Sequence, residues 1–352
     1  MWYEFTNCGL RHIQCRRTFE ITLDQEEYIK NLRPIIHSDL KGKSKDTECS
    51  LELTQLFMSL LGAVAYALMT RIDIAVFVCA LQRVTHKPHI IHVKRLNAVL
   101  RWMQANPKRI CFKKMSNNTH LRCVGDAAFR KEENDGRSLR GALFLRADPV
   151  HSGSHLTNGV HLGTEGQLAE GSRTSTLTLA SSSGDQSVKV GERRQIFEGS
   201  CSVHIIDAIC KSQRHVTRST FSSELLSACD TADHGMLLAL TLHEFSKGVQ
   251  SSASCRSLRE IGGWDVKLGL YVDAMSVYAA VTATFLKIPA EKSLLSHVQY
   301  LRELLDTKVI EALIWIDTRD MCADGLTKGA VDRSAVHSIM DGNWTITQPS
   351  RS

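Results

Sequence analysis

The sequence predicts an α/β fold in which helices cover a mixed β-sheet. In the second half of the 352-residue chain, short strand-like apolar stretches alternate with longer stretches whose apolar residues recur every three or four positions. Their order is strand, strand, strand, helix, strand, helix, helix, strand, which is typical of a mixed sheet with helices on its faces. Because 43% of the residues are apolar, the chain can bury a core, and its length suggests two domains.

The first 118 residues predict a smaller, mostly helical region. The alternating stretch RHIQCRRTFEITL suits a strand or a hairpin, and LDQEEYIKNL, which overlaps its end, looks helical. From Leu51 to about Ala105 the apolar residues follow a helical spacing. Pro88 should separate two of these helices, because the residue before a proline is driven out of the helical conformation.

Residues 119–330 predict the sheet domain. Its first two strands, HLRCVGDAAF and LRGALFLR, are joined by a polar turn with Asp135-Gly136 at its tip. A third strand, SVHIIDAIC, precedes a long helix over about residues 220–246. The remaining elements are a fourth strand (VKLGLYVD), two helices (MSVYAAVTATFL and EKSLLSHVQYLRELLD) and a fifth strand (VIEALIWID).

Two segments show no sustained pattern. In residues 151–185, 18 of 35 residues are Ser, Thr or Gly, so we predict a low-complexity insertion over about residues 149–199. The last segment, residues 331–352, is expected to form an irregular tail, because no strand or helix period continues through it.

Positive charge is concentrated in one part of the chain, although the net charge is only +6. Ten basic residues and a single acid, Asp73, lie between Arg71 and Lys114. This asymmetry favours a polyanionic partner such as nucleic acid. A solvated helical face is the alternative interpretation.

The cysteines and the apolar runs predict an intracellular protein, cytoplasmic or nuclear. Eleven cysteines are scattered without a C-x-x-C pair, which argues against a zinc ribbon and against a disulfide framework. The longest apolar run, from Leu56 to Met69, is too short to span a bilayer, and the N-terminus lacks the apolar core of a signal peptide. We therefore expect neither secretion nor a membrane span.

Four acidic residues lie where a strand or helix pattern would normally place another residue type. Asp126 interrupts the apolar first strand, and Asp273 stands at the C-terminal tip of the fourth. Glu224 lies on the first turns of the long helix, and Asp324 follows the fifth strand. A lone aspartate at a strand end is more often a turn or a helix cap than a ligand, so only the ordered set points to a site.

The helix that carries Glu224 has small residues on the same face. Ala228, Thr231 and Gly235 follow it at spacings of three and four, so the helix can pack closely on the sheet and bring the carboxylate over the strand ends. Converging carboxylates repel one another unless cations lie between them, and oxygen ligands select Mg²⁺ or Mn²⁺. Two such ions about 4 Å apart promote phosphodiester hydrolysis, and carboxyl groups more than about 8 Å apart would contradict a shared site.

These segments resemble the C-terminal part of a copia-type LTR-retrotransposon Pol polyprotein. The stretch SLLGAVAYALMTRIDIA resembles the S-L-I-G-x-L-x-Y-L-x-x-T-R-P-D-I-A block at the end of the family's reverse transcriptase. The stretches VGDAAF, RSTFSSELLSA, LYVDAMSV and CADGLTK are similar to motifs of its RNase H domain. The resemblance implies an RNase H-like mixed five-stranded sheet with flanking helices, preceded by a small, mostly helical reverse transcriptase remnant.

The resemblance also implies a function and a site. The metal-binding and catalytic acids would be Asp126, Glu224, Asp273 and Asp324, holding two Mg²⁺ or Mn²⁺ ions. The partner would be an RNA–DNA hybrid, whose RNA strand is hydrolysed, or another nucleic acid, and association with a polymerase-bearing Pol chain is a further expectation. The candidate phosphate contacts are Lys94, Arg95, Arg101, Lys108 and Arg109.

Departures from the family pattern keep two other interpretations open. The Y-x-D-D polymerase motif should precede Trp2, so we predict no DNA synthesis by this chain. Four family positions carry other residue types here, at Ile72, Ala128, Ala274 and Met275, and a non-catalytic nucleic-acid-binding remnant is the first alternative. An integrase or transposase catalytic domain is the second, and the CADGLTK match argues against it.

Overall fold

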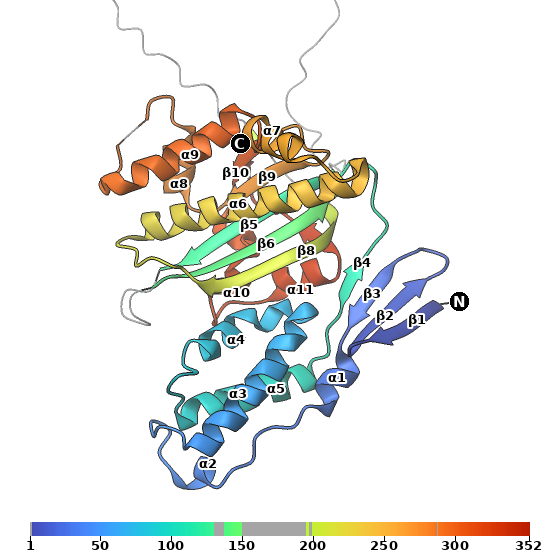
Figure 1. Cartoon of the computed structure of the whole chain (residues 1–352), viewed down its shortest axis with the longest axis vertical. Coiled ribbons are helices and arrows are strands. Elements are labelled where there is room, and N and C mark those ends of the chain that lie inside the picture. The colour runs from blue at the N-terminus through green and yellow to red at the C-terminus, as the bar shows by residue number, and fades with distance from the viewer. Residues whose placement is uncertain (1, 130–136, 150–194, 197–198, 287) are drawn as a thin grey trace, which may run out of the picture.

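The computed structural model describes residues 2–129, 137–149, 195–196, 199–286 and 288–352. The predicted α/β class is confirmed, since a curled mixed sheet is combined with helices (Figure 1). The polar turn predicted at Asp135-Gly136 and nearly all of the expected insertion lie outside the described residues.

The main sheet contains all five predicted strands as neighbours. Its order is β11-β8-β6-β5-β9-β10-β12-β7. Strand β6 is antiparallel to its two neighbours, β5 and β8, whereas β9 and β10 run parallel to β5. The five strands are β5 (His120–Ala128), β6 (Leu139–Ala147), β8 (Ser200–Ser212), β9 (Lys267–Val272) and β10 (Ala312–Trp315).

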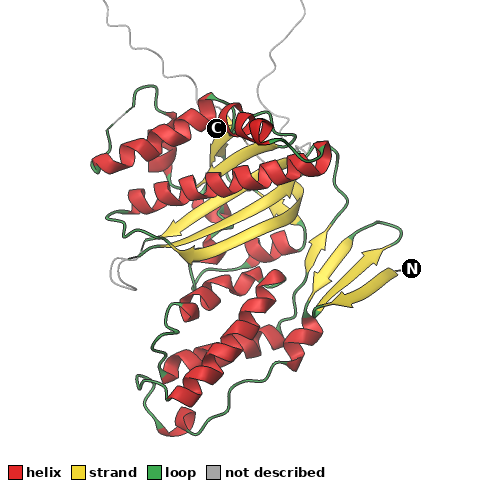
Figure 2. Ribbon diagram, viewed as in Figure 1, coloured by secondary structure: helices red, strands yellow, loops and turns green. Residues whose placement is uncertain are grey.

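Helices cover both faces of this sheet (Figure 2). Alternation along the strands divides the core, because Phe144 and Leu270 face one layer while Leu143 and Tyr271 face the other. The first layer contains α6 (Thr220–Lys247), α8 (Met275–Thr282) and α9 (Leu295–Asp306), with α7 (Ser252–Ile261) at its rim. The second contains α10 (Asp324–Thr327) and α11 (Ser334–Met340).

The expectation of an irregular tail over residues 331–352 is wrong. Besides α11, the segment forms β11 (Asn343–Thr345), which pairs with the start of β8, and β12 (Ser350–Arg351), which pairs with β10 and with β7 (Gln195–Ile196). Trp344 is 3% exposed and packs against the sheet. Strands of two or three residues are too short to show a period, which is why the sequence pattern misses them.

The N-terminal region has the predicted hairpin and helices. Antiparallel strands β1 (Trp2–Asn7), β2 (Leu10–Cys15) and β3 (Ile21–Asp24) continue into β4 (Ile110–Phe112), a strand that the sequence pattern did not predict. The helices are α1 (Glu26–Asn31), α2 (Asp39–Gly42), α3 (Leu51–Tyr66), α4 (Ala75–Gln82) and α5 (Ile90–Ala105).

One helix among the described residues, Leu51–Met69, is long and apolar enough to cross a membrane by length and composition. This helix consists of α3 and the short 3₁₀ turn that follows it, Ala67–Met69. The apolar segment is therefore longer than the run from Leu56 to Met69 that the sequence suggested. Length alone therefore does not exclude a span by this helix. Leu53, Phe57 and Val64 are completely buried in the core shared with α4 and α5, and a core helix meets the same criterion.

Helix α6 lies very close to β5, as the small residues on its inner face predict. Ala228 and Thr231 are almost completely buried. A Cβ atom added to Gly235 would lie 2.6 Å from the Sγ atom of Cys123 on β5. The missing side chain therefore sets the distance between this helix and the sheet.

Replacing Gly235 by Ala should lower the free energy of unfolding by about 1–3 kcal/mol, because the added methyl group overpacks the contact with Cys123. The matched control is Gly62→Ala in α3, where an added Cβ would have no atom within 4 Å. That change should raise the free energy of unfolding by about 0.5–1 kcal/mol, since alanine favours helix. Urea titrations measure the free energy of unfolding of both variants. A change of the same sign in both would contradict these predictions.

Candidate metal centre

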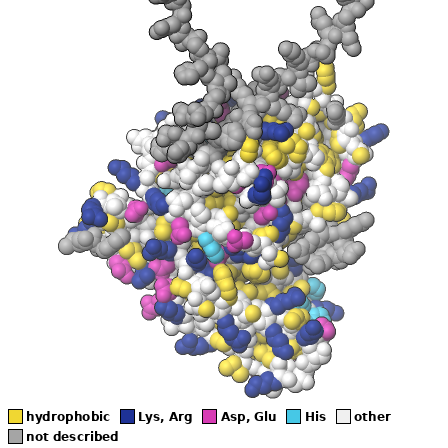
Figure 3. Space-filling model, turned by 180° about the vertical axis from the view of Figure 1, so that it is seen from behind, with side chains coloured by type: hydrophobic (Ala, Val, Ile, Leu, Met, Phe, Trp, Pro, Cys, Tyr) yellow, Lys and Arg dark blue, Asp and Glu magenta, His cyan; other side chains and the backbone are white. Residues whose placement is uncertain are grey.

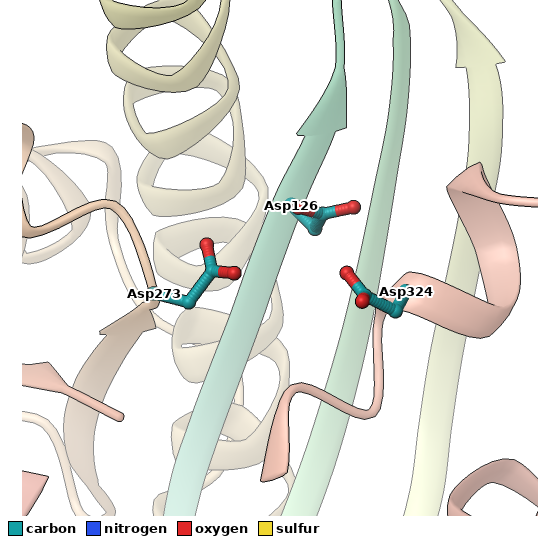
Figure 4. A group of neighbouring side chains, drawn as sticks. All are labelled: Asp126, Asp273 and Asp324. Carbon is teal, nitrogen blue, oxygen red and sulfur yellow. The ribbon is translucent and has the colours of Figure 1, made fainter. Parts of the chain in front are cut away.

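Three carboxylates from three separate elements converge at one end of the sheet. Asp126 lies on β5, Asp273 directly follows β9, and Asp324 begins α10. One possible ligand oxygen of each lies within 4.8 Å of those of the other two. Figure 4 shows the three side chains around a common space beside β5. For these three of the four predicted acids, the separation is within the limit of about 8 Å for a shared metal site.

Strand pairing brings Asp126 and Asp273 together. The parallel pairing of β5 with β9 ends at Val124 and Tyr271, so both acids lie just beyond the last paired residues. The indole N–H of Trp315 donates to the backbone oxygen of Asp273 at 2.7 Å, and the Thr318 hydroxyl donates to its carboxylate at 3.0 Å. These bonds hold the strand end and orient the Asp273 side chain.

Helix α10 brings the third acid to the site by packing directly on β6. A Cβ atom added to Gly141 of β6 would lie 2.8 Å from the Cβ of Leu326 and 2.8 Å from the Cγ2 of Thr327. The Thr327 hydroxyl donates to Oδ2 of Asp126. Asp324, at the first position of this short helix, is thereby held opposite Asp126.

Asp126 carries the clearest sign of an incomplete environment. Its side chain is 1% exposed, and its Oδ1 atom is buried without a hydrogen-bond partner among the described residues. A buried carboxylate oxygen without a donor is costly, because desolvation is not compensated. A divalent cation bound by the three acids would compensate it, so the residues fit a metal ion.

Glu224 joins the same charged cluster from α6. Its Oε2 atom accepts a hydrogen bond of 3.1 Å from the backbone N–H of Ala127, next to Asp126. Burial, together with the charges of Asp126 and Asp273, raises the pKa of Glu224 to about 9. The structure therefore places Glu224 beside the triad, although it is not one of the three acids whose oxygens lie within 4.8 Å of one another.

The electrostatics of the triad favour a cation. Burial raises the pKa of Asp126 to about 6, with Lys328 opposing and Asp324 adding to the increase. Burial also raises the pKa values of Asp273 and Asp324, and neighbouring carboxylates add to both. All three shifts reflect charged forms that lack full compensation. This buried acidic triad could bind a metal ion.

Two residues of the centre were not predicted as site residues. Besides Thr327, the ammonium group of Lys328 contacts Oδ1 of Asp324 and lies 3.8 Å from Oδ1 of Asp126. Both lie in the stretch CADGLTK, where they follow Asp324 at the spacings of three and four that bring helical side chains together. This spacing was the sequence signal that could have identified Thr327 and Lys328 as neighbours of Asp324.

The predicted phosphate contacts lie in the N-terminal region. Lys94, Arg95 and Arg101 project from the exposed face of α5. Arg109 is exposed and Lys108 partly exposed, just before β4. Figure 3 shows Lys and Arg side chains spread over the lower, N-terminal part of the face that it presents.

Comparison with known proteins gives one curated relative. The chain is 27% identical over 122 residues to the retrovirus-related Pol polyprotein from transposon RE1 of Arabidopsis thaliana. The match covers 34% of this chain and 8% of that protein, so the chain spans only a small part of its relative. No protein family and no solved structure matches the chain. The similarity supports a retrotransposon Pol origin.

Proposed function

We propose that this chain is a retrotransposon-derived RNase H-type endonuclease that hydrolyses the RNA strand of RNA–DNA hybrids. The observation that carries the proposal is the convergence of Asp126, Asp273 and Asp324, whose possible ligand oxygens lie within 4.8 Å of one another, with a buried Asp126 oxygen that has no hydrogen-bond partner in the described part of the chain. The central strand order β8-β6-β5-β9-β10 supports an RNase H-like fold for residues 119–330. Residues 1–118 would be the reverse transcriptase remnant.

The four acids would hold two Mg²⁺ or Mn²⁺ ions. Asp126 and Asp273 would bind or flank both, Asp324 would complete one site, and Glu224 would hold one ion and help to place the attacking water. When bound, the ions activate that water and stabilise the leaving oxygen of the phosphodiester. The chain's own contribution is to keep the carboxylates converged and largely buried, so no side-chain nucleophile is required.

Cleavage of a labelled RNA–DNA hybrid by the purified chain tests the proposal. We expect cleavage of the RNA strand with Mg²⁺ or Mn²⁺, none with a chelator, and much less with duplex DNA or single-stranded RNA. Absence of cleavage under all metal conditions, with the folded state verified by circular dichroism, would contradict the enzymatic function.

A non-catalytic nucleic-acid-binding remnant is the second candidate. It is favoured by the contact of Lys328 with Asp324, which supplies positive charge inside the acid cluster without a metal ion. In both candidates the exposed basic residues of α5 would contact phosphates, and a polymerase-bearing Pol chain would be a further partner. Hybrid binding without cleavage would favour this candidate.

Neutralising Lys94, Arg95 and Arg101 together with alanine should weaken hybrid binding and flatten its salt dependence. The slope of log K against log salt should fall in magnitude by roughly 2–3, because each lost phosphate contact removes nearly one released counterion. Fluorescence anisotropy at several salt concentrations measures the slope. The control variant, Arg256→Ala/Arg259→Ala on α7 at the opposite end of the molecule in Figure 1, should keep it. Equal slopes in all three proteins would contradict the assignment.

A further inference from the structure

We infer that Lys328 is a built-in counter-ion of the acid cluster, which a divalent ion must displace from Asp126 and Asp324 in order to bind. The inference rests on the proposed metal centre and adds a residue that regulates how tightly that centre binds its ion. Lys328 acts on the carboxylates and is therefore a positioning residue.

The geometry fixes Lys328 at the acids. It caps the C-terminus of α10, where its backbone N–H donates to the backbone carbonyl oxygen of Asp324 at 2.8 Å. Its ammonium group contacts Oδ1 of Asp324, four residues earlier, and lies 3.8 Å from Oδ1 of Asp126. That Asp126 oxygen is the buried atom without a hydrogen-bond partner among the described residues. One ammonium group therefore faces two members of the triad.

The compensation that Lys328 provides is incomplete. A separation of 3.8 Å is too long for a hydrogen bond, so Asp126 gains Coulomb attraction without a donated proton. A single positive charge also faces the three converging carboxylates of Asp126, Asp273 and Asp324. A divalent ion brings twice the charge and can contact several oxygens directly, so it can outcompete the ammonium group.

The Lys328 side chain can move from the acid cluster into solvent. It is 35% exposed, and its flexible four-carbon stem allows the ammonium group to move into water while the backbone of α10 stays in place. Displacement therefore does not require α10 to unfold. The same exposure means that Lys328 opposes metal binding by a moderate amount rather than blocking it.

Substitution of Lys328 with methionine separates this role from an ordinary helical ion pair. The full chain would be titrated with Mn²⁺ by calorimetry, and its melting temperature would be measured in a chelator and in saturating Mn²⁺. We expect Lys328→Met to bind Mn²⁺ about tenfold more tightly than the wild type, because a positive charge next to the ligands is removed. Its melting temperature should fall in the chelator and recover in saturating Mn²⁺.

Two further variants serve as controls. Lys43→Met removes a lysine from another Asp–Lys pair with the same spacing of four residues, Asp39–Lys43, on the N-terminal region, and should leave Mn²⁺ affinity unchanged. Lys328→Arg keeps the positive charge, so its Mn²⁺ affinity should stay close to that of the wild type.

The possible outcomes are distinct. Unchanged or weaker Mn²⁺ binding by Lys328→Met, with the wild type binding Mn²⁺ and cleaving the hybrid, would overturn the counter-ion role and leave the proposed function intact. Failure of both proteins to bind Mn²⁺ would overturn the metal centre and this inference together. Mn²⁺ binding that is tighter in Lys328→Met than in the wild type, and unchanged in the two control variants, would support the inference.

Discussion

Replacing Asp126 by Asn is expected to remove hybrid cleavage while making the metal-free protein more stable at pH 8. The catalytic loss should be at least about 100-fold, because a direct ligand should contribute more than the outer partners whose loss costs 10–100-fold. Asp273→Asn should lose activity similarly, since its carboxylate faces the same space. Cleavage assays at fixed Mg²⁺ measure both losses.

The gain in stability follows from the sign of the pKa shift. Burial raises the pKa of Asp126 to about 6. Between about pH 4 and pH 6 the folded state therefore holds a proton on Asp126 that the unfolded chain has already released. The stability that protonated Asp126 contributes is fully present below about pH 4 and is lost as the pH rises through 6. At pH 8 the metal-free wild type carries a penalty on the order of 3 kcal/mol that asparagine lacks.

Urea titrations in a chelator at pH 5 and pH 8 check this result. The stabilising effect of Asp126→Asn should be larger at pH 8 than at pH 5. The control is Asp306→Asn at the exposed end of α9, which should leave both activity and pH dependence unchanged. Equal cleavage by the wild type and Asp126→Asn would show that a contaminating nuclease produces the signal.

Long elements could be predicted from the sequence because they repeat a pattern. The strand expected over HLRCVGDAAF is β5 (His120–Ala128), and the helix expected over about residues 220–246 is α6 (Thr220–Lys247). Short elements could not, since their pairing depends on distant residues. Trp344, for example, is placed by antiparallel pairing with Cys201 far earlier in the chain.

The candidate site was predictable in its acids and not in its other contacts. Asp126 interrupts an apolar strand, Asp273 follows the end of another, and together with Glu224 and Asp324 their order along the chain suggests a site. The position of Lys328 opposite Asp126 depends on how α10 packs against β6 at Gly141, which no local pattern contains. Metal roles for the acids, and phosphate contacts by the basic residues, remain predictions for the experiments above.

Arg71→Met is expected to lower the free energy of unfolding by about 3–5 kcal/mol, the usual cost of leaving a buried charge without its partner. Arg71 and Asp73 are both 0% exposed and form two hydrogen bonds, of 2.9 and 3.0 Å. The guanidinium also donates to the backbone oxygen of Met103 at 3.3 Å and lies over the ring of Trp102. Methionine fills much of the volume of the arginine side chain but makes none of these interactions.

A surface pair with the same chemistry provides the control. Arg319 and Asp317 are also two residues apart and form two hydrogen bonds, of 2.8 and 3.0 Å, but Arg319 is 69% exposed. Water solvates both charges there, so Arg319→Met should change stability far less than Arg71→Met. Urea titrations compare the two variants. Similar losses would mean that burial does not determine the importance of the Arg71–Asp73 pair.

Removing the second charge should rescue the first variant. Burial alone would raise the pKa of Asp73, and hydrogen bonds from His337 and Arg71 outweigh it, so the pKa lies below its usual value. Without Arg71, the side-chain hydrogen bond that this carboxylate keeps among the described residues is the one with His337, at 3.4 Å. Arg71→Met/Asp73→Asn should therefore recover a large part of the lost stability, because a buried amide costs less than an unpaired buried charge.

The Arg71–Asp73 pair also connects the N-terminal region to the helix α11, which packs beside the candidate metal centre. Asp73 contacts His337 of α11, and its backbone oxygen accepts a hydrogen bond of 2.9 Å from Arg333. Helix α11 in turn packs on α10, where a Cβ atom added to Gly325 would lie 2.5 Å from the Cγ2 of Val336. Because Asp324 begins α10, loss of Arg71 should loosen one of the three acids as well as the N-terminal core. Mn²⁺ affinity should therefore fall in Arg71→Met and recover in the double variant.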